Sequence, residues 1–279
     1  IGLPGTSLTF QSSDFAQIML LLFFARVLAI EFGKWEHFKD VLKKLMLPVV
    51  IICVLIFPAN FSTAALLFVN ALFLIFMGGV PMRHLIKLAG LVGLASVLLA
   101  LWIWFAPGTI PGNRGPTWKS RIEHFSDGSS KNNYQSEQAK MAIANGGILG
   151  KGPGNSTQRA FLPQASSDFI FAIVLEEYGF VSAVFILFLY LILLYRCIRL
   201  VRMRDKPFAG FIALGLSFSL VFQALMNMGV AVDLFPVPGP PLPLISLGGT
   251  SILFTLMSLG ILLSVSQSQD QVKPVEPKS

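Results

Sequence analysis

Charged residues are scarce in this 279-residue chain, where only 13% of positions are Asp, Glu, Lys or Arg and 54% are hydrophobic. Soluble globular domains carry about 25% charged residues, so the composition excludes an ordinary soluble domain. The mean hydropathy of +0.72 is typical of a polytopic membrane protein. The net charge of +7 is therefore interpreted as a topology signal, and no nucleic-acid partner is expected.

Residues that form disulfides or bind metals are few as well. The two cysteines, Cys53 and Cys197, lie within or at the end of apolar runs, and the three histidines are scattered. This pattern argues against a disulfide framework and against a zinc site. The chain also lacks an initiator Met and a visible signal peptide, so we expect upstream spans to be absent from it.

Long apolar runs dominate what is present. The longer ones can cross about 30 Å of hydrocarbon at 1.5 Å per residue. One is short and is bracketed by Pro48 and Pro58, but the alternation of the loops requires it to cross. We predict an all-α fold, a polytopic helical membrane protein with about seven transmembrane helices. The predicted spans are residues 14–30, 45–59, 61–78, 85–106, 168–195, 208–232 and 245–266.

Lys and Arg residues are distributed unevenly between the connections. They gather in 31–44, 79–87 and 196–206, whereas the connections near 58–61 and 233–244 contain neither residue. The positive-inside rule places the three basic connections in the cytoplasm, together with a tail at 267–279. Residues 107–167 then form one large extracytoplasmic loop within a single membrane domain that spans 1–279.

A glycine-rich stretch, "NGGILGKGPGNSTQR" (145–159), follows a predicted helix that ends at Gly146. Glycines allow backbone N–H groups to approach a ligand, and successive N–H groups form anion-binding nests. The stretch therefore suits a phosphate or pyrophosphate, although taken alone it fits a flexible linker better. The candidate ligand-binding residues are Lys151, Asn155, Gln158 and Arg159, with Arg121 earlier in the loop.

Three carboxylates lie in or beside an apolar run in "FLPQASSDFIFAIVLEEYGF" (161–180). Asp168 belongs to a Ser-Ser-Asp-Phe tetrapeptide that recurs at 12–15. Local sequence favours a helix-capping role for it, but a carboxylate at the outer membrane boundary also suits a general base.

Glu176 and Glu177 would lie roughly 12–13.5 Å beyond Asp168 along a helix, which argues against a glycosidase-like carboxylate pair. They are expected to hold the helix or to line a cavity. Two alternatives remain open here. Either 168–178 is a half-helix that ends at Gly179, or 168–195 is one continuous tilted helix.

Several blocks of the sequence occur in the order of a known family. "FQSSDFAQIMLLLFFARVLA" resembles a Gln-Pro-Ser-Glu-Phe segment that leads into a span. "NYQSEQAKMAIANGGILGKGPGNSTQRAFLPQASSDFIFAIVLEEYGF" resembles a block that ends in Thr-Asp-Phe-Ile-Phe-Ala and Glu-Glu-x-Gly. "LPLISLGGTS" resembles Leu-Pro-x-x-Ser-Tyr-Gly-Gly-Ser-Ser. Together these blocks resemble the SEDS family (shape, elongation, division and sporulation), most closely its division branch.

The resemblance implies a fold of ten transmembrane helices, so that about three upstream helices are expected to be absent here. It also implies a glycosyltransferase of the bacterial cytoplasmic (inner) membrane, at the division septum, that polymerises lipid II. The growing glycan on undecaprenyl pyrophosphate would be transferred to the lipid II 4-hydroxyl on the extracytoplasmic side. Asp168 matches the catalytic Asp of the family, and Asp14 is interpreted as structural.

The resemblance further implies partners and a cofactor. A class B penicillin-binding protein with transpeptidase activity, other divisome membrane proteins and membrane lipids are the expected partners. A divalent cation, Mg²⁺ or Mn²⁺, is expected near Asp168, and no organic cofactor. The sequence departs from the family pattern at Gln164, Ser166, Ser167 and Leu247. Pro238 stands where some division members have Lys, so any role of that Lys is not transferred.

Two functions from other classes remain as alternatives. Broken helices and membrane carboxylates also suit a transporter that flips lipid II. A divisome scaffold without chemistry of its own is the other alternative.

Overall fold

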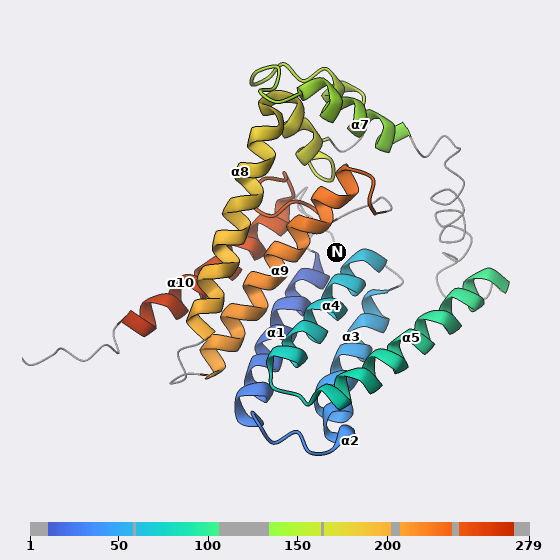
Figure 1. Ribbon diagram of the computed structural model, residues 1–279, viewed down its shortest axis with the longest axis vertical. Coiled ribbons are helices and arrows are strands. Elements are labelled where there is room, and N and C mark those ends of the chain that lie inside the picture. Colours follow the sequence, from blue (N-terminus) through green and yellow to red (C-terminus); the bar gives the residue numbers. More distant parts are fainter. Residues whose placement is uncertain are drawn as a thin grey trace, which may run out of the picture.

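The computed structural model describes residues 11–57, 60–105, 134–162, 165–201, 207–235 and 240–270, and these residues form helices and turns without any strand. Figure 1 shows α9 in the middle of the bundle, with α8 and α10 on one side and α1 and α4 on the other. The α-helices are α1 (Ser12–Ile30), α2 (Phe38–Val41), α3 (Leu47–Ile56), α4 (Phe61–Met77), α5 (Met82–Phe105), α7 (Tyr134–Gly146), α8 (Ile170–Val201), α9 (Pro207–Ala231) and α10 (Gly249–Asp270).

The all-α membrane architecture is confirmed. A helix lies at each of the seven predicted spans, and α1, α9 and Ile170–Arg199 of α8 are long and apolar enough to cross a membrane. Large apolar side chains cover the outer faces, as shown by Leu55 of α3, which is 74% exposed, and Phe185 of α8, which is 60% exposed. Such faces suit contact with lipid rather than water, so the chain is an integral membrane protein.

The predicted start of the second span was wrong. We placed it at residue 45, but the helix begins at Phe38 and passes through a π-helical turn, Leu42–Met46, into α3. Lys39, Lys43 and Lys44, which we assigned to a loop, therefore lie on this helix. The wider turn precedes Pro48, a residue that cannot donate the usual helical hydrogen bond.

The predicted start of the last span was wrong in the opposite direction, because its helix begins at Gly249 and not at residue 245. Residues 240–248 instead form irregular turns, and Leu244 has a positive φ of 68°. The predicted tail at 267–279 begins inside α10, because that helix continues to Asp270. Residues 107–133 of the predicted outer loop, 271–279 of the tail, and Pro238 lie outside the described residues.

The centre of the molecule is α9, which is buried far more completely than the other long helices. In the most apolar stretch of α9, 67% of the residues are buried, compared with 17% in the corresponding stretch of α8. Gly215 permits a close approach of α4, because a Cβ atom there would lie 2.9 Å from Leu74 Cδ1. Because α9 is held on several sides, it is the rigid element against which the candidate site is built.

The first two basic connections lie toward the same end of the bundle, the lower end in Figure 1, and the ends of α8 and α9 that border the third connection point toward that end. His84 Nε2 is 3.2 Å from the Glu36 carbonyl, which joins the first connection to the second. The Phe32 and Phe211 rings, 6.0 Å apart, join the first connection to the start of α9. This arrangement is the one that the positive-inside assignment requires.

The helix α8 is broken at Gly179, where φ is 74° and ψ is −176°. Only glycine adopts this conformation readily. Tyr190, after the break, donates to the Pro243 carbonyl, while Ser246 donates to the Ser167 carbonyl, before the break. Tyr190 in the long arm and Ser167 in the turn before the short arm therefore contact the same loop before α10, so residues 170–178 form a half-helix that turns back at Gly179.

Candidate functional site

Asp168 lies in the turn that precedes the half-helix of α8. Its side chain is half-buried, and Ser167 Oγ donates to its Oδ1 at 2.8 Å. Among the described residues the carboxylate has no ion-pair partner. Within the same residues it accepts its hydrogen bond from the Ser167 hydroxyl and not from the backbone N–H groups that begin α8. The Asp168 side chain is therefore not occupied by the capping role that its local sequence favoured.

Burial raises the pKa of the Asp168 carboxyl above its ordinary value, and the hydrogen bond from Ser167 offsets only part of that rise. A carboxylate with a raised pKa is a better proton acceptor than a fully hydrated one. The position therefore has the accessibility and the basicity that a general base requires.

The backbone around Asp168 is held at three consecutive carbonyl groups. Leu247 N donates to Ser166 O at 2.9 Å, and Ser246 Oγ donates to Ser167 O at 2.6 Å. Asn227 Nδ2, from α9, donates to Asp168 O at 2.9 Å. The turn is thus attached both to the central helix and to the loop before α10.

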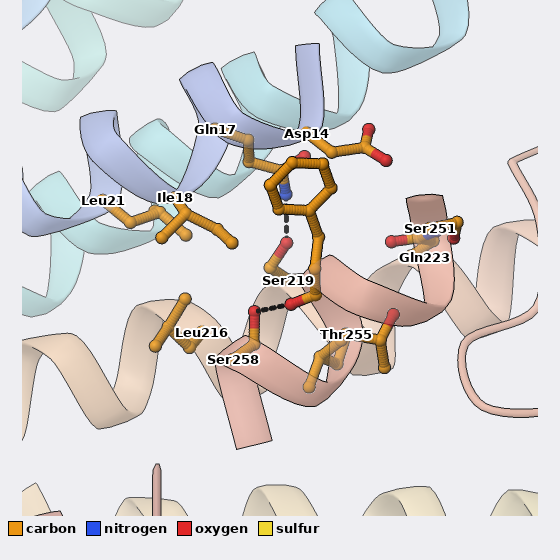
Figure 2. Close-up of a pocket in the computed structure, with 12 residues that line it drawn as sticks. Asp14, Gln17, Ile18, Leu21, Leu216, Ser219, Gln223, Ser251, Thr255 and Ser258 are labelled. Carbon is orange, nitrogen blue, oxygen red and sulfur yellow. Dashed lines mark hydrogen bonds between the residues drawn. The ribbon is translucent and has the colours of Figure 1, made fainter. Parts of the chain in front are cut away.

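The second Ser-Ser-Asp-Phe tetrapeptide has a different environment. Asp14 lies in the first turn of α1 and faces a small cavity of about 40 Å³ between α1, α9 and α10 (Figure 2). Gln17 Nε2 donates to Ser219 Oγ across this cavity, and Gln223 lines its far side. The tetrapeptide at 12–15 thus begins helix α1 inside the bundle, whereas the identical tetrapeptide at 166–169 lies in a fixed turn before α8.

Glu176 is fully buried, and the glycine-rich loop wraps around it. Its carboxylate accepts hydrogen bonds from Lys151 Nζ at 2.9 Å, Ser156 Oγ at 2.5 Å and Thr157 Oγ1 at 2.8 Å. The backbone N–H groups of Thr157 and Gln158 also donate to it, at 3.3 and 3.2 Å. The anion held by this loop in the folded chain is therefore a side chain of the protein itself.

Glycines allow the loop to approach the half-helix this closely. A Cβ atom on Gly150 would lie 2.3 Å from the Glu177 carbonyl oxygen, and one on Gly146 would lie 2.0 Å from the Leu175 carbonyl oxygen. Lys151 N and Gly152 N donate to the Glu176 and Glu177 carbonyls at 3.0 and 2.9 Å. The half-helix therefore ends in hydrogen bonds from the loop rather than in unpaired carbonyl groups.

The residues predicted to bind pyrophosphate differ in their contacts in the structure. Lys151 is paired with Glu176, Asn155 Nδ2 donates to Lys151 O at 3.0 Å, and Gln158 donates its N–H to Glu176. Arg159 is exposed and forms no ion pair among the described residues. Arg121 lies outside the described residues, so its role, like that of the other four, stays a prediction.

Sequence reasoning missed Asn227, which contacts the Asp168 carbonyl, and Ser246, which contacts the Ser167 carbonyl next to it. A polar amide within the last turns of the predicted apolar span 208–232 was a usable signal for Asn227. Ser246 lies in one of the family blocks, but no local pattern indicates that its hydroxyl reaches Ser167. Both contacts join residues far apart in sequence, which periodicity does not predict.

The described residues contain no group of three or more His, Cys, Asp or Glu side chains that could hold a metal ion. Asp168 is therefore not part of a cage of protein ligands. A single carboxylate fits only the mode in which Mg²⁺ is held by one carboxylate together with phosphate oxygens of a substrate.

Comparison with known proteins identifies the family. A family model described as "Cell cycle protein", for FtsW, RodA and SpoVE, matches residues 1–271. The chain belongs to this family. Its relatives in the FtsW/RodA/SpoVE family include the probable peptidoglycan glycosyltransferase FtsW of Halomonas elongata, 29% identical over all of this chain and 70% of the relative. The FtsW of Hydrogenovibrio crunogenus is 32% identical over 94% of this chain and 67% of the relative.

Solved structures of the family have the same fold. One is a chain of a peptidoglycan synthase complex that coordinates polymerization and crosslinking, with a TM-score of 0.71, 28% identity, and coverage of 95% of this chain and 72% of that one. The rod shape determining protein RodA of Thermus thermophilus has a TM-score of 0.61 and 26% identity, over 98% of this chain and 70% of that one.

Proposed function

We propose that the chain is a peptidoglycan glycosyltransferase that polymerises lipid II on the extracytoplasmic side of the bacterial inner membrane, during septal wall synthesis. The observation that supports this function most directly is the setting of Asp168. It is a half-buried carboxylate with no cation beside it among the described residues, held in a turn that three hydrogen bonds fix. Such a group can accept a proton from a sugar hydroxyl.

The position of Asp168 along α9 supports an extracytoplasmic active site. Asn227, which contacts Asp168, lies twenty residues after Pro207, where α9 leaves the basic connection. Twenty helical residues extend for about 30 Å, which is the thickness of the hydrocarbon core. With the basic connection in the cytoplasm, Asp168 lies at the opposite membrane surface.

The reaction is a single displacement at the anomeric carbon of the growing glycan. The 4-hydroxyl oxygen of lipid II attacks that carbon while its proton passes to the Asp168 carboxylate. The bond from the anomeric carbon to the pyrophosphate oxygen breaks with inversion, and undecaprenyl pyrophosphate leaves with the electron pair. The protonated Asp168 then releases its proton to water, which restores the carboxylate for the next transfer.

The departing pyrophosphate needs positive charge. Arg159 is an exposed cation of the glycine-rich loop, and Lys151 of the same loop has 33% of its side chain exposed. A divalent cation bound by Asp168 and the substrate phosphates would supply further charge neutralisation.

A partner transpeptidase follows from the same proposal. The solved peptidoglycan synthase complex couples polymerization to crosslinking, and a class B penicillin-binding protein is the partner that would crosslink strands made by this chain. Other divisome membrane proteins would recruit the pair to the septum.

The deciding experiment measures lipid II polymerisation by purified protein reconstituted in liposomes. We expect wild-type protein to form glycan strands and Asp168→Asn to lose at least about 100-fold in rate, since the amide cannot accept the proton. Glu137→Gln is the matched control, because Glu137 is an exposed carboxylate of α7 in the same outer loop, and it should retain the wild-type rate.

Folding of each variant is checked by its thermal unfolding in detergent. Wild-type polymerisation by folded Asp168→Asn protein contradicts the assignment of Asp168. Translocation of lipid II without polymerisation supports the transporter, which the broken helix at Gly179 also suits. Neither activity in wild-type protein supports the scaffold.

A further inference from the structure

Asn227 is a fully buried amide on the central helix that joins two loops. Its Nδ2 donates to Asp168 O at 2.9 Å and to Pro240 O at 2.8 Å. The amide is costly to place there, because polar groups inside a membrane bundle are expensive. Its Oδ1 is buried without a hydrogen-bond partner among the described residues, which adds to that cost.

Ser246 makes a second attachment to the same turn. Its hydroxyl accepts from Leu242 N at 2.7 Å and donates to Ser167 O at 2.6 Å. It is 4% exposed, so no water competes for these bonds. The Ser246 hydroxyl thereby holds its own loop and, through the same group, the carbonyl of the residue next to Asp168.

We propose that Asn227 and Ser246 are positioning residues that hold the Asp168 carboxylate where the acceptor hydroxyl is deprotonated. Hydrogen bonds to the carbonyls of Ser167 and Asp168 restrain the peptide planes on both sides of the Asp168 Cα atom. The direction of the Cα–Cβ bond is set by those planes. The buried ring of Phe169, 1% exposed, anchors the following residue, so the carboxylate is aimed from both sides.

The inference rests on the proposed polymerase function. It explains why two costly polar groups, the Asn227 amide and the Ser246 hydroxyl, are buried beside the Asp168 turn. An apolar packing of the same loops would avoid that cost. Displacing a catalytic group by about 1 Å can lower a rate by roughly 100-fold, so a fixed Asp168 carboxylate offsets the cost of the buried amide and hydroxyl.

The test compares reconstituted Ser246→Ala, Asn227→Leu and wild-type protein in lipid II polymerisation over a range of pH. We expect kcat to fall about 10- to 100-fold, with KM for lipid II within about threefold of wild type. Ser246→Thr keeps the hydroxyl and should recover most of the rate. Ser217→Ala is the matched control, because the buried Ser217 hydroxyl donates to the Leu214 carbonyl of its own helix and contacts Cys197 of α8, and neither partner belongs to the Asp168 turn.

The pH profile separates positioning from general loss of structure. Burial raises the pKa of Asp168 in the native turn, and a loosened turn admits water and lowers that pKa toward its ordinary value. The acid limb of kcat should therefore move to lower pH in Ser246→Ala, and it should return to its wild-type position in Ser246→Thr. A smaller amount of folded protein would reduce the apparent kcat at every pH and leave the limb in place.

Wild-type kcat and pH profile in folded Ser246→Ala and Asn227→Leu overturn the inference, as does an equal loss in Ser217→Ala. A higher KM with unchanged kcat also overturns it. If Ser246→Ala does not fold, Ser246→Cys, which keeps a weak donor, must give a kcat below that of Ser246→Thr or the inference fails. Absence of polymerisation by wild-type protein, in contrast, refutes the proposed function but not the positioning of the turn. In that case faster hydrogen exchange at the Leu242 and Leu247 amides in Ser246→Ala would still show that Ser246 holds the turn.

Discussion

Two aspartates with the same neighbours show how far a residue's role depends on what lies across from it. Asp14 and Asp168 share the tetrapeptide Ser-Ser-Asp-Phe. Asp14 faces the small cavity between α1, α9 and α10, whereas Asp168 occupies a turn fixed by α9 and the loop before α10. The local sequence predicted a capping role for both, and only distant residues distinguish them.

Glu176 gives a second example at the residue scale and a testable prediction. Replacing it by Gln removes the charge that balances Lys151 and leaves several donors with a weaker acceptor. We expect a loss of roughly 1–3 kcal/mol in the free energy of unfolding, measured as a lower Tm in detergent. Glu177→Gln is the control, since no ion pair or side-chain hydrogen bond of Glu177 is among the described contacts, and its Tm should change little. A Tm for Glu176→Gln equal to that of the control contradicts the anchoring role.

At the scale of elements, the half-helix depends on one backbone conformation. The sequence left a continuous helix and a broken helix as alternatives at Gly179, and the structure favours the break. Periodicity did not separate them, because predominantly apolar stretches, 169–175 and 180–194, lie on both sides of the Glu-Glu-Tyr-Gly segment. The decisive contacts come from Gly147 and Ile148, whose carbonyls accept from Phe180 and Val181.

Substituting Gly179 by Ala tests this element. The new Cβ would lie 2.2 Å from the Ile148 carbonyl oxygen, at a φ of 74°, and strained backbone of this kind costs about 1–3 kcal/mol before any clash. We expect a lower Tm and a lower polymerisation rate, because the half-helix carries Asp168 at its start. Gly260→Ala in α10, where nothing lies within 4 Å of a built Cβ, should leave both unchanged. Equal behaviour of the two variants would argue for a continuous helix.

On the scale of the whole molecule, hydropathy predicted where along the described residues the long apolar helices lie and in what order. These properties depend on composition over some twenty residues, which the bilayer itself selects. Helix ends were predicted less well, since the π-helical turn at 42–46 and the late start of α10 depend on local backbone geometry. The partners of Glu176 and Asp168 were not predicted, because they lie about 20 to 80 residues away in the chain.

The orientation of the bundle is itself a prediction. In protein whose Cys53 and Cys197 are replaced by Ala, we expect Asn155→Cys to react with a membrane-impermeant maleimide added outside intact cells. Lys39→Cys, near the basic end, should react only after the membrane is opened. Both positions are polar and lie outside the cores of the spans, so labelling reports sidedness. The reverse pattern would place Asp168 in the cytoplasm and exclude an extracytoplasmic polymerase.

The ion pair of Glu176 with Lys151 also has a consequence for biogenesis. Both charges belong to one stretch of chain, 25 residues apart, and closing a loop of that length costs little more entropy than closing a shorter one. The segment can therefore neutralise its own buried charge as soon as it has crossed the membrane, without waiting for α9 or α10 to be synthesised. Contacts between residues this close in sequence form readily during folding, so the glycine-rich loop can pair with the half-helix before α9 and the loop before α10 fix the Asp168 turn.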